Sequence, residues 1–197
     1  IFRLIRKHIA GPTMNSAIKK AKAINAKGLP VSIAFLSDTP SARAKANYIS
    51  NAYAQLIREM ARQGIKSSVH LRMAQLGSGI SKDIAKLNLL RLLEISRKYG
   101  ILIWAEARTP TDVALLNELS GNRGLGIFFS SIDDALSYVK KKVSAPMVKV
   151  LCKWDDGGKS KDYKKRLPRM LEELSSKINT LVLLSPDDEM LKYFSKS

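Results

Sequence analysis

His70 and Arg72 are the two residues whose position most suggests chemistry. They lie in the stretch SVHLRMAQLG, residues 68–77, which predicts a short buried strand followed by a glycine-containing loop. In a parallel α/β barrel, the carboxyl ends of the strands carry the catalytic side chains. The pair therefore indicates a working active site or the remains of one. For His70 the alternative is a strand histidine held by a hydrogen bond in the core.

Other residue types that support catalysis or metal binding are scarce. His8 and His70 are the only histidines, and Cys152 is the only cysteine, which excludes an internal disulfide framework and a cysteine zinc site. The densest carboxylates, WDD at 154–156 and PDDE at 186–189, are expected in a loop and at a helix start, where acids are favoured anyway. We expect no catalytic residue and no metal site. The single cysteine favours a reducing, cytoplasmic setting.

Apolar runs alternate with helical patterns along the chain, and six short strands are expected. Thr13 and Ser41 are placed to start helices, while Gly64 and Gly100 are placed to end them. Strands rich in Val, Ile and Leu, each followed by a helix, indicate an α/β fold with a parallel sheet. The expected strands are 31–36, 67–72, 101–106, 125–129, 147–152 and 179–184, and the expected helices are 13–27, 41–63, 81–99, 109–119, 131–142, 161–177 and 186–194.

These elements favour a TIM-barrel-like (β/α) layout. The first strand is followed by no G-x-G-x-x-G, and the chain has no phosphate-loop motif, so a dinucleotide-binding sheet is less favoured. The length of 197 residues and the 45% hydrophobic content suit one domain over 1–197, with basic N-terminal helices at 1–28. Six strands cannot close an eight-stranded barrel, so we expect an incomplete or open one. No apolar run is long enough to span a bilayer, and we expect no membrane partner.

Positive charge is the strongest compositional feature. Lys and Arg number 34 against 17 Asp and Glu, which gives a net charge of +17. Such an imbalance is costly through self-repulsion, and it favours a polyanionic partner. A lysine-rich surface of a heat-adapted protein is the alternative, although such surfaces gain Glu together with Lys.

The basic residues gather in three regions. Residues 1–37 contain no acid, and two further clusters lie at 140–142 and 159–169. Clusters of this kind indicate contacts to a phosphate backbone, although an isolated charge run is usually a solvated helix face. The RNA-binding candidates are Arg3, Arg6, Lys7, Lys19, Lys20, Lys22, Lys27, Lys140, Lys141, Lys142, Lys159, Lys161, Lys164, Lys165, Arg166 and Arg169.

Several segments in order resemble the proline dehydrogenase family, a flavin-dependent (β/α)8 barrel that oxidises proline. They are FRLIRKHIAGPTMNSAIKKAKAINAKGLPVSIAFLSD, SSVHLRMAQLG, GILIWAEA, GLGIFFSS, APMVKVLCKW and TLVLLSPDDEMLKYF. The resemblance implies a barrel fold and, in an intact member, FAD or FMN as cofactor.

The resemblance also implies that the functional positions are replaced. His70 stands where the family has a lysine over the flavin, and Trp104 where it has an aspartate, while Glu106 remains. Phe128 lies in a segment that carries a flavin-binding Gln-Ala-Tyr in the family, and Lys149 replaces an arginine that contacts the flavin. The chain stops before the family's helix of paired arginines, which binds the proline carboxylate. The residues of this vestigial pocket are His70, Arg72, Trp104, Glu106, Phe128 and Lys149.

We therefore expect a non-catalytic proline dehydrogenase-like protein without a cofactor. Its partners would be ribosomal RNA and, as further candidates, ribosomal proteins, because basic residues spread over several elements suit contacts to a large RNA. The alternative is a divergent flavin-dependent proline dehydrogenase that oxidises L-proline with FAD or FMN. A third possibility is a small-anion site in which Lys149 and Arg72 converge. The sequence does not predict an oligomeric state.

Overall fold

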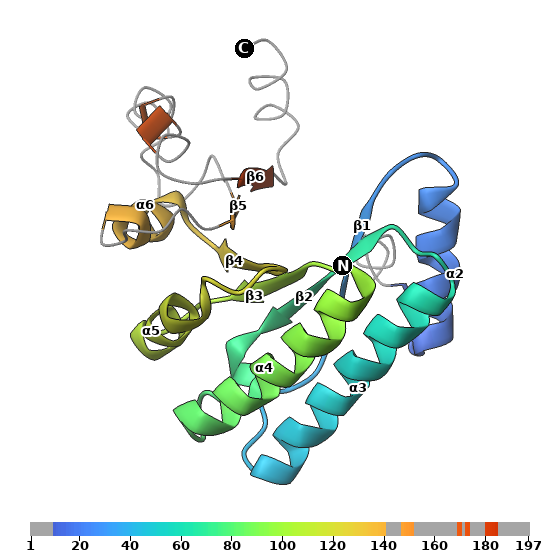
Figure 1. Cartoon of the computed structure of the whole chain (residues 1–197), viewed down its shortest axis with the longest axis horizontal. Coiled ribbons are helices and arrows are strands. Elements are labelled where there is room, and N and C mark those ends of the chain that lie inside the picture. The colour runs from blue at the N-terminus through green and yellow to red at the C-terminus, as the bar shows by residue number, and fades with distance from the viewer. Residues whose placement is uncertain (1–9, 141–146, 152–168, 171, 174–179, 185–197) are drawn as a thin grey trace, which may run out of the picture. The chain divides into compact units, whose positions relative to one another are not determined.

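The computed structural model describes residues 10–140, 147–151, 169–170, 172–173 and 180–184. The chain forms two compact units, one of residues 1–103 and one of residues 104–197, and each is described by itself. Their strands and helices alternate along the chain (Figure 1).

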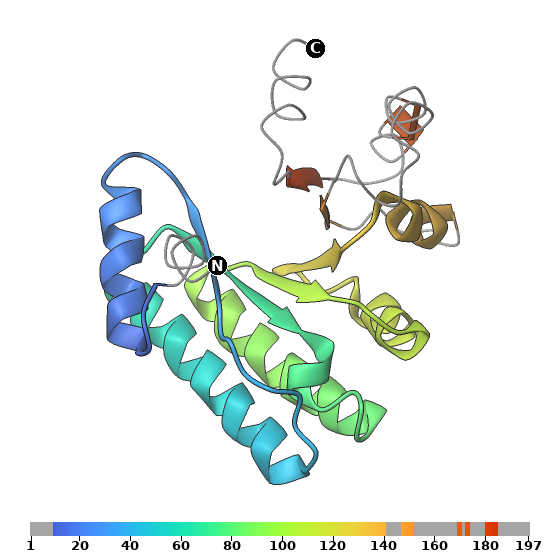
Figure 2. The same ribbon diagram turned by 180° about the vertical axis from the view of Figure 1, so that it is seen from behind.

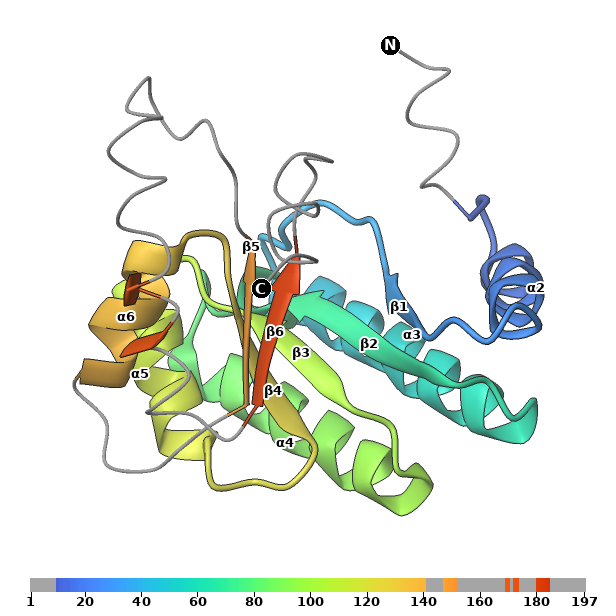
Figure 3. The same cartoon turned by 90° about the horizontal axis from the view of Figure 1, so that it is seen from above.

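The described residues of the first unit form three α-helices, two complete strands and one turn of 3-10 helix. In chain order these are α2 (Met14–Asn25), β1 (Val31–Ala34), α3 (Arg43–Arg62), β2 (Ser67–Arg72), η1 (Met73–Leu76) and α4 (Lys82–Tyr99). Strands β1 and β2 are parallel, and Ala34 pairs with His70. The helices α3 and α4 pack against each other on the same side of the two strands, whereas α2 packs beside β1 (Figures 2 and 3).

The helix ends in this unit follow from local side chains. Thr13 and Ser16 form a capping box at the start of α2, and the Ser81 hydroxyl accepts a hydrogen bond from the Asp83 N–H at the start of α4. Gly100 ends α4 at φ +66°, a left-handed conformation that glycine adopts without a Cβ clash. The predicted start and end signals of this helix are therefore confirmed.

Strand β2 separates its residues between two environments. Val69 and Leu71 are fully buried on the side that α3 and α4 cover, whereas His70 and Arg72 are half-buried on the opposite face. The expected strand at 67–72 is confirmed, and its buried side chains are Val69 and Leu71. The expected glycine-containing connection after Arg72 begins with one turn of 3-10 helix, η1, which ends at Gly77.

The second unit continues the same alternation. Its elements are β3 (Ile103–Glu106), which begins at the last residue of the first unit, α5 (Pro110–Leu119), β4 (Leu125–Phe129), α6 (Ile132–Lys140), β5 (Met147–Leu151) and β6 (Thr180–Leu184). Strands β4, β5 and β6 are parallel neighbours. The N–H of Ala107 donates to the carbonyl oxygen of Phe128, 3.2 Å away, which places Glu106 beside Phe128 and Trp104 beside Gly126.

The predicted α/β class with six strands that alternate with helices is confirmed. Neighbouring strands within each unit are consecutive in the chain, as in a (β/α) barrel, and the six described strands are two fewer than an eight-stranded barrel requires. Strand β1 ends at Ala34 rather than at residue 36, and β3 begins at Ile103 rather than at residue 101. The predicted helix at 186–194 and most of the one at 161–177 lie outside the described residues.

Candidate functional site

In the second unit, one face of the sheet carries four of the expected pocket residues. The centroid of the Phe129 ring lies 5.2 Å from that of the Tyr138 ring of α6. The face of β4 that contains Phe129 therefore packs on this helix. Phe128 points to the other face, which corresponds to the interior of a barrel. Phe128 and Lys149 are paired in register, and the β3–β4 hydrogen bond places Trp104 and Glu106 on that same face.

The indole of Trp104 occupies the space over Gly126. A Cβ at residue 126 would overlap Cζ3 and Cε3 of the Trp104 ring, so glycine is needed for the two strands to hold the indole in this position. Trp104 is only 4% exposed. The interior face of β3 and β4 is therefore filled by the protein's own aromatic side chain.

Lys149 is a buried lysine on this face. The residue is 6% exposed, and its Nζ lies 5.1 Å from the centroid of the Trp104 ring, within the range of a cation–π interaction. Burial lowers the pKa of the Lys149 amine, because an ammonium ion loses hydration inside the protein. The side chain is thus a single point charge held against an aromatic face.

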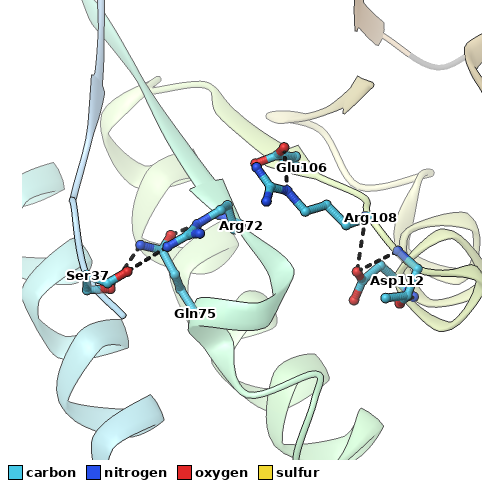
Figure 4. A network of polar contacts seen from close by, with 7 residues as sticks. Ser37, Arg72, Gln75, Glu106, Arg108 and Asp112 are labelled. Carbon is cyan, nitrogen blue, oxygen red and sulfur yellow. Dashed lines mark hydrogen bonds and ion pairs between the residues drawn. The ribbon is translucent and has the colours of Figure 1, made fainter. Parts of the chain in front are cut away.

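Glu106, the buried carboxylate on this face, is held by an ion pair. Its Oε1 accepts a hydrogen bond from Nε of Arg108 at 2.8 Å (Figure 4). The backbone N–H groups of Arg108 and Thr109 donate to Oδ2 of Asp112, at 3.2 and 3.1 Å, which fixes the turn between β3 and α5. This ion pair favours a structural role for Glu106 at the turn.

In the first unit, the end of β2 is held by a polar network. Arg72 Nη2 donates to the carbonyl oxygen of Ser37 at 2.6 Å, and the Arg72 N–H donates to Oε1 of Gln75 at 3.0 Å (Figure 4). Gln75 Nε2 donates to the carbonyl oxygen of Phe35 at 2.7 Å and to Oγ of Ser37 at 3.0 Å. The Arg72 guanidinium is therefore used to hold the loop after β1.

Tyr53 of α3 also belongs to this network. Its hydroxyl lies 3.1 Å from both the carbonyl oxygen of His70 and Oε1 of Gln75, and it accepts the Phe35 N–H at 3.2 Å. Burial raises the pKa of Tyr53 to about 12, so the hydroxyl keeps its proton near neutral pH. The sequence analysis missed Tyr53 and Gln75, since no local motif marks a contact between segments this far apart.

The expected pocket residues thus fall into two groups. Trp104, Glu106, Phe128 and Lys149 share one face of the second unit, and the half-buried pair of His70 and Arg72 lies in the first unit. The roles expected for these six residues, and a shared anion site of Lys149 and Arg72, remain predictions.

Helix α2 presents a basic surface. Lys19, Lys22 and Lys27 are exposed on the helix and on the turn that follows it, and Lys20 is half-buried. Asn25 attaches the end of α2 to the start of β2, because its Oδ1 accepts the Lys66 N–H at 2.8 Å and its Nδ2 donates to the Lys66 carbonyl oxygen at 3.0 Å. We define the α2 surface as Lys19, Lys22, Lys27 and Lys66, the last of which the sequence analysis missed.

Most of the other candidate basic residues cannot be placed. Lys140 lies at the end of α6, with Nζ 3.5 Å from Oε1 of Glu173, and Arg169 is exposed. The remaining candidates lie outside the described residues: Arg3, Arg6, Lys7, Lys141, Lys142, Lys159, Lys161, Lys164, Lys165 and Arg166. Within the described ranges, the side chains form no cluster of three potential metal ligands, and no helix is both long and apolar enough to cross a membrane.

The fold defines the class of protein: an α/β chain of the (β/α)-barrel type. Solved structures that resemble this chain support this class of fold. A proline utilization A protein (PutA) from Bdellovibrio bacteriovorus aligns with a TM-score of 0.67 at 15% identity, over 90% of this chain and 25% of that one. A D-tagatose 3-epimerase-like protein aligns with a TM-score of 0.63 at 15% identity, over 91% of this chain and 82% of the other.

Sequence relatives point to one family within this class. Proline dehydrogenase 1 of Bacillus subtilis is 26% identical over 98 residues, and proline dehydrogenase 2 of the same organism is 29% identical over 97 residues. The match covers about half of this chain (50% and 49%) and 32% of each relative. No model of a known protein family matches the sequence. The chain is proline dehydrogenase-like, as its sequence segments predicted.

Proposed function

We propose that this proline dehydrogenase-like chain does not oxidise proline and binds RNA through a basic surface, as a ribosome-associated protein of the cytoplasm. The net charge of +17 supports the proposal most, together with the exposed lysines of α2 in a segment that contains no acid. A polyanion is the partner that such a surface binds best, because each neutralised phosphate releases a condensed counterion.

The interior face of the second unit supports the loss of flavin chemistry. Trp104 fills the space over Gly126, and Glu106 is held by Arg108. Lys149 presents a single point charge, whereas an arginine presents a planar fork of donors that matches an anion in two places. A planar cofactor at this face would have to displace the indole.

The distribution of charge supports a folded RNA as partner. The exposed basic residues come from a helix, a turn and the start of a strand, which suits several phosphate contacts over one surface. The aromatic rings on the described strands, Trp104, Phe128 and Phe129, are buried, so they offer no exposed platform on which single-stranded bases could stack.

We predict that excess FAD or FMN leaves the melting temperature of the full chain unchanged. A ligand that binds only the folded state must stabilise it, by about 2.7 kcal/mol at a concentration 100 times its Kd. The measurement is a thermal melt with and without each flavin. A clear rise in melting temperature, or purified protein with flavin absorbance, would instead favour a divergent proline dehydrogenase.

We also predict that ribosomal RNA binds the full chain with an affinity that falls steeply with salt. If roughly 5–8 phosphates are contacted, the slope of log K against log salt should be about −4 to −7. Filter binding across a series of salt concentrations measures this slope. A slope near zero would exclude phosphate contacts as the basis of binding.

A further inference from the structure

Two large apolar side chains of the first unit are exposed next to the lysines of the α2 surface. Tyr99, the last residue of α4, is 40% exposed, and Leu29, on the turn after α2, is 57% exposed. Leu29 follows Lys27 by two residues, and its carbonyl oxygen accepts a hydrogen bond from Nδ2 of Asn25 at 2.8 Å. An exposed ring and an exposed aliphatic side chain are therefore available to a ligand that the lysines attract.

The strand register places Tyr99 and Leu29 on either side of Lys66. The Val31 N–H donates to the Lys66 carbonyl oxygen at 3.4 Å, so the residues before β1 and before β2 are neighbours. The Val69 N–H donates to the Leu102 carbonyl oxygen at 2.9 Å, which sets the residues before β2 beside the turn that follows α4. The ends of α3 and α4 lie at the same end of this unit, with α2 beside the end of α3 (Figures 1 and 2). Lys66 thus has an apolar side chain in each neighbouring segment.

This combination of side chains suits an unpaired nucleotide. An unpaired base in a loop or bulge stacks on an exposed aromatic ring, while the phosphates beside it bind lysines. The bases of a duplex stack on one another and offer no free face to Tyr99. Nζ of Lys98 lies 5.8 Å from the centroid of the Tyr99 ring, within the range of a cation–π interaction, and base stacking does not require this lysine.

We propose that Tyr99 stacks on one unpaired base of the RNA whose phosphates bind the α2 surface. Lys66 is the lysine placed to bind the phosphate of that nucleotide, and Leu29 borders the site on its other side. The proposal rests on the proposed RNA-binding function and adds a class of ligand to it: a folded RNA with an unpaired nucleotide in a loop or bulge.

The test compares two RNA probes with the same number of phosphates, a stem–loop and a blunt duplex, by fluorescence anisotropy with the full chain. The wild type should bind the stem–loop more tightly than the duplex. Tyr99→Ala should weaken binding to the stem–loop by about fivefold or more, as the loss of one base stack predicts, and leave binding to the duplex unchanged. The salt slope for the stem–loop should stay the same, because stacking releases no condensed counterion.

Two variants control for the ring and for its position. Tyr99→Phe keeps the ring and should bind the stem–loop as the wild type does. Tyr48→Ala removes another exposed tyrosine, which has Lys45 at 5.1 Å from its ring centroid and lies 14 residues before the end of α3, roughly 21 Å along the helix axis. This variant should bind both probes like the wild type, and all variants should keep the circular dichroism spectrum.

The outcomes separate this site from the proposed function. If the wild type binds both probes and Tyr99→Ala binds the stem–loop equally well, the stacking site is wrong and RNA binding stands. An equal loss in Tyr48→Ala, or a lower salt slope in Tyr99→Ala, would also overturn the stacking site. If the wild type binds neither probe at low salt, the proposed function fails together with it.

Discussion

Replacing Lys19, Lys22 and Lys27 by glutamate should lower the affinity of the full chain for ribosomal RNA about 100-fold at low salt. Three exposed cations of the α2 surface become anions, so the net charge falls by six, from +17 to +11. Each lost phosphate contact should also reduce the salt slope by about 1. Filter binding of wild type and variant, at several salt concentrations, measures both effects.

A matched variant separates the α2 surface from net charge alone. Lys45, Lys82 and Lys98 are exposed on α3 and α4, and their replacement by glutamate also lowers the net charge by six. We expect this control to bind RNA at least tenfold better than the α2 variant, because local contacts dominate over distant charge. Equal losses in the two variants would show that the α2 surface has no special role. Both should keep the thermal stability of wild type within about 0.5 kcal/mol, as expected for surface substitutions.

Gly126→Ala should destabilise the protein by about 1–3 kcal/mol, the usual cost of adding a methylene to a well-packed core. The added Cβ would overlap the Trp104 ring, which is buried. For a chain of this size the melting temperature should fall by about 2–4 °C for each kcal/mol. Thermal or urea unfolding measures the change.

The cause can be assigned with a double-mutant cycle. In a Trp104→Leu background, the further change Gly126→Ala should cost less than in wild type, with a coupling energy of about 1–3 kcal/mol. Gly121→Ala is the matched control in the same unit, since a Cβ there meets no atom within 4 Å. If Gly126→Ala is as stable as wild type, the indole does not occupy the space over residue 126, and the argument against a bound flavin loses its main support.

The sequence predicts the elements well where local signals set them. Thr13 and Ser81 start helices and Gly100 ends one because their caps involve residues within a few positions. Strand β1 is shorter than its apolar run, because Gln75 binds the carbonyl oxygen of Phe35 and draws the chain into a loop. That contact joins residues 40 positions apart, so no local sequence pattern predicts it.

In the candidate site, too, the sequence predicts what local patterns set and misses contacts between distant side chains. The register places Glu106, Phe128 and Lys149 in one row, which alternation along the strands predicts in outline. Two features could not be predicted in this way: the ion pair of Arg108 with Glu106 and the position of the Trp104 indole over Gly126. Both depend on side-chain packing, which the periodicity of the sequence does not predict. Lys66 joins the α2 surface only because Asn25 holds the start of β2 against the end of α2.

Sedimentation of the wild-type protein with ribosomes from its own cells tests the central claim most directly. At low salt, the full chain should move with the ribosomal particles in a sucrose gradient, and at high salt it should return to the top, because salt competes with the lysines for phosphate. If the protein stays at the top at low salt, and filter binding also detects no affinity for ribosomal RNA, the proposed function is wrong. The charge of +17 would then be better explained as the surface of a heat-adapted protein.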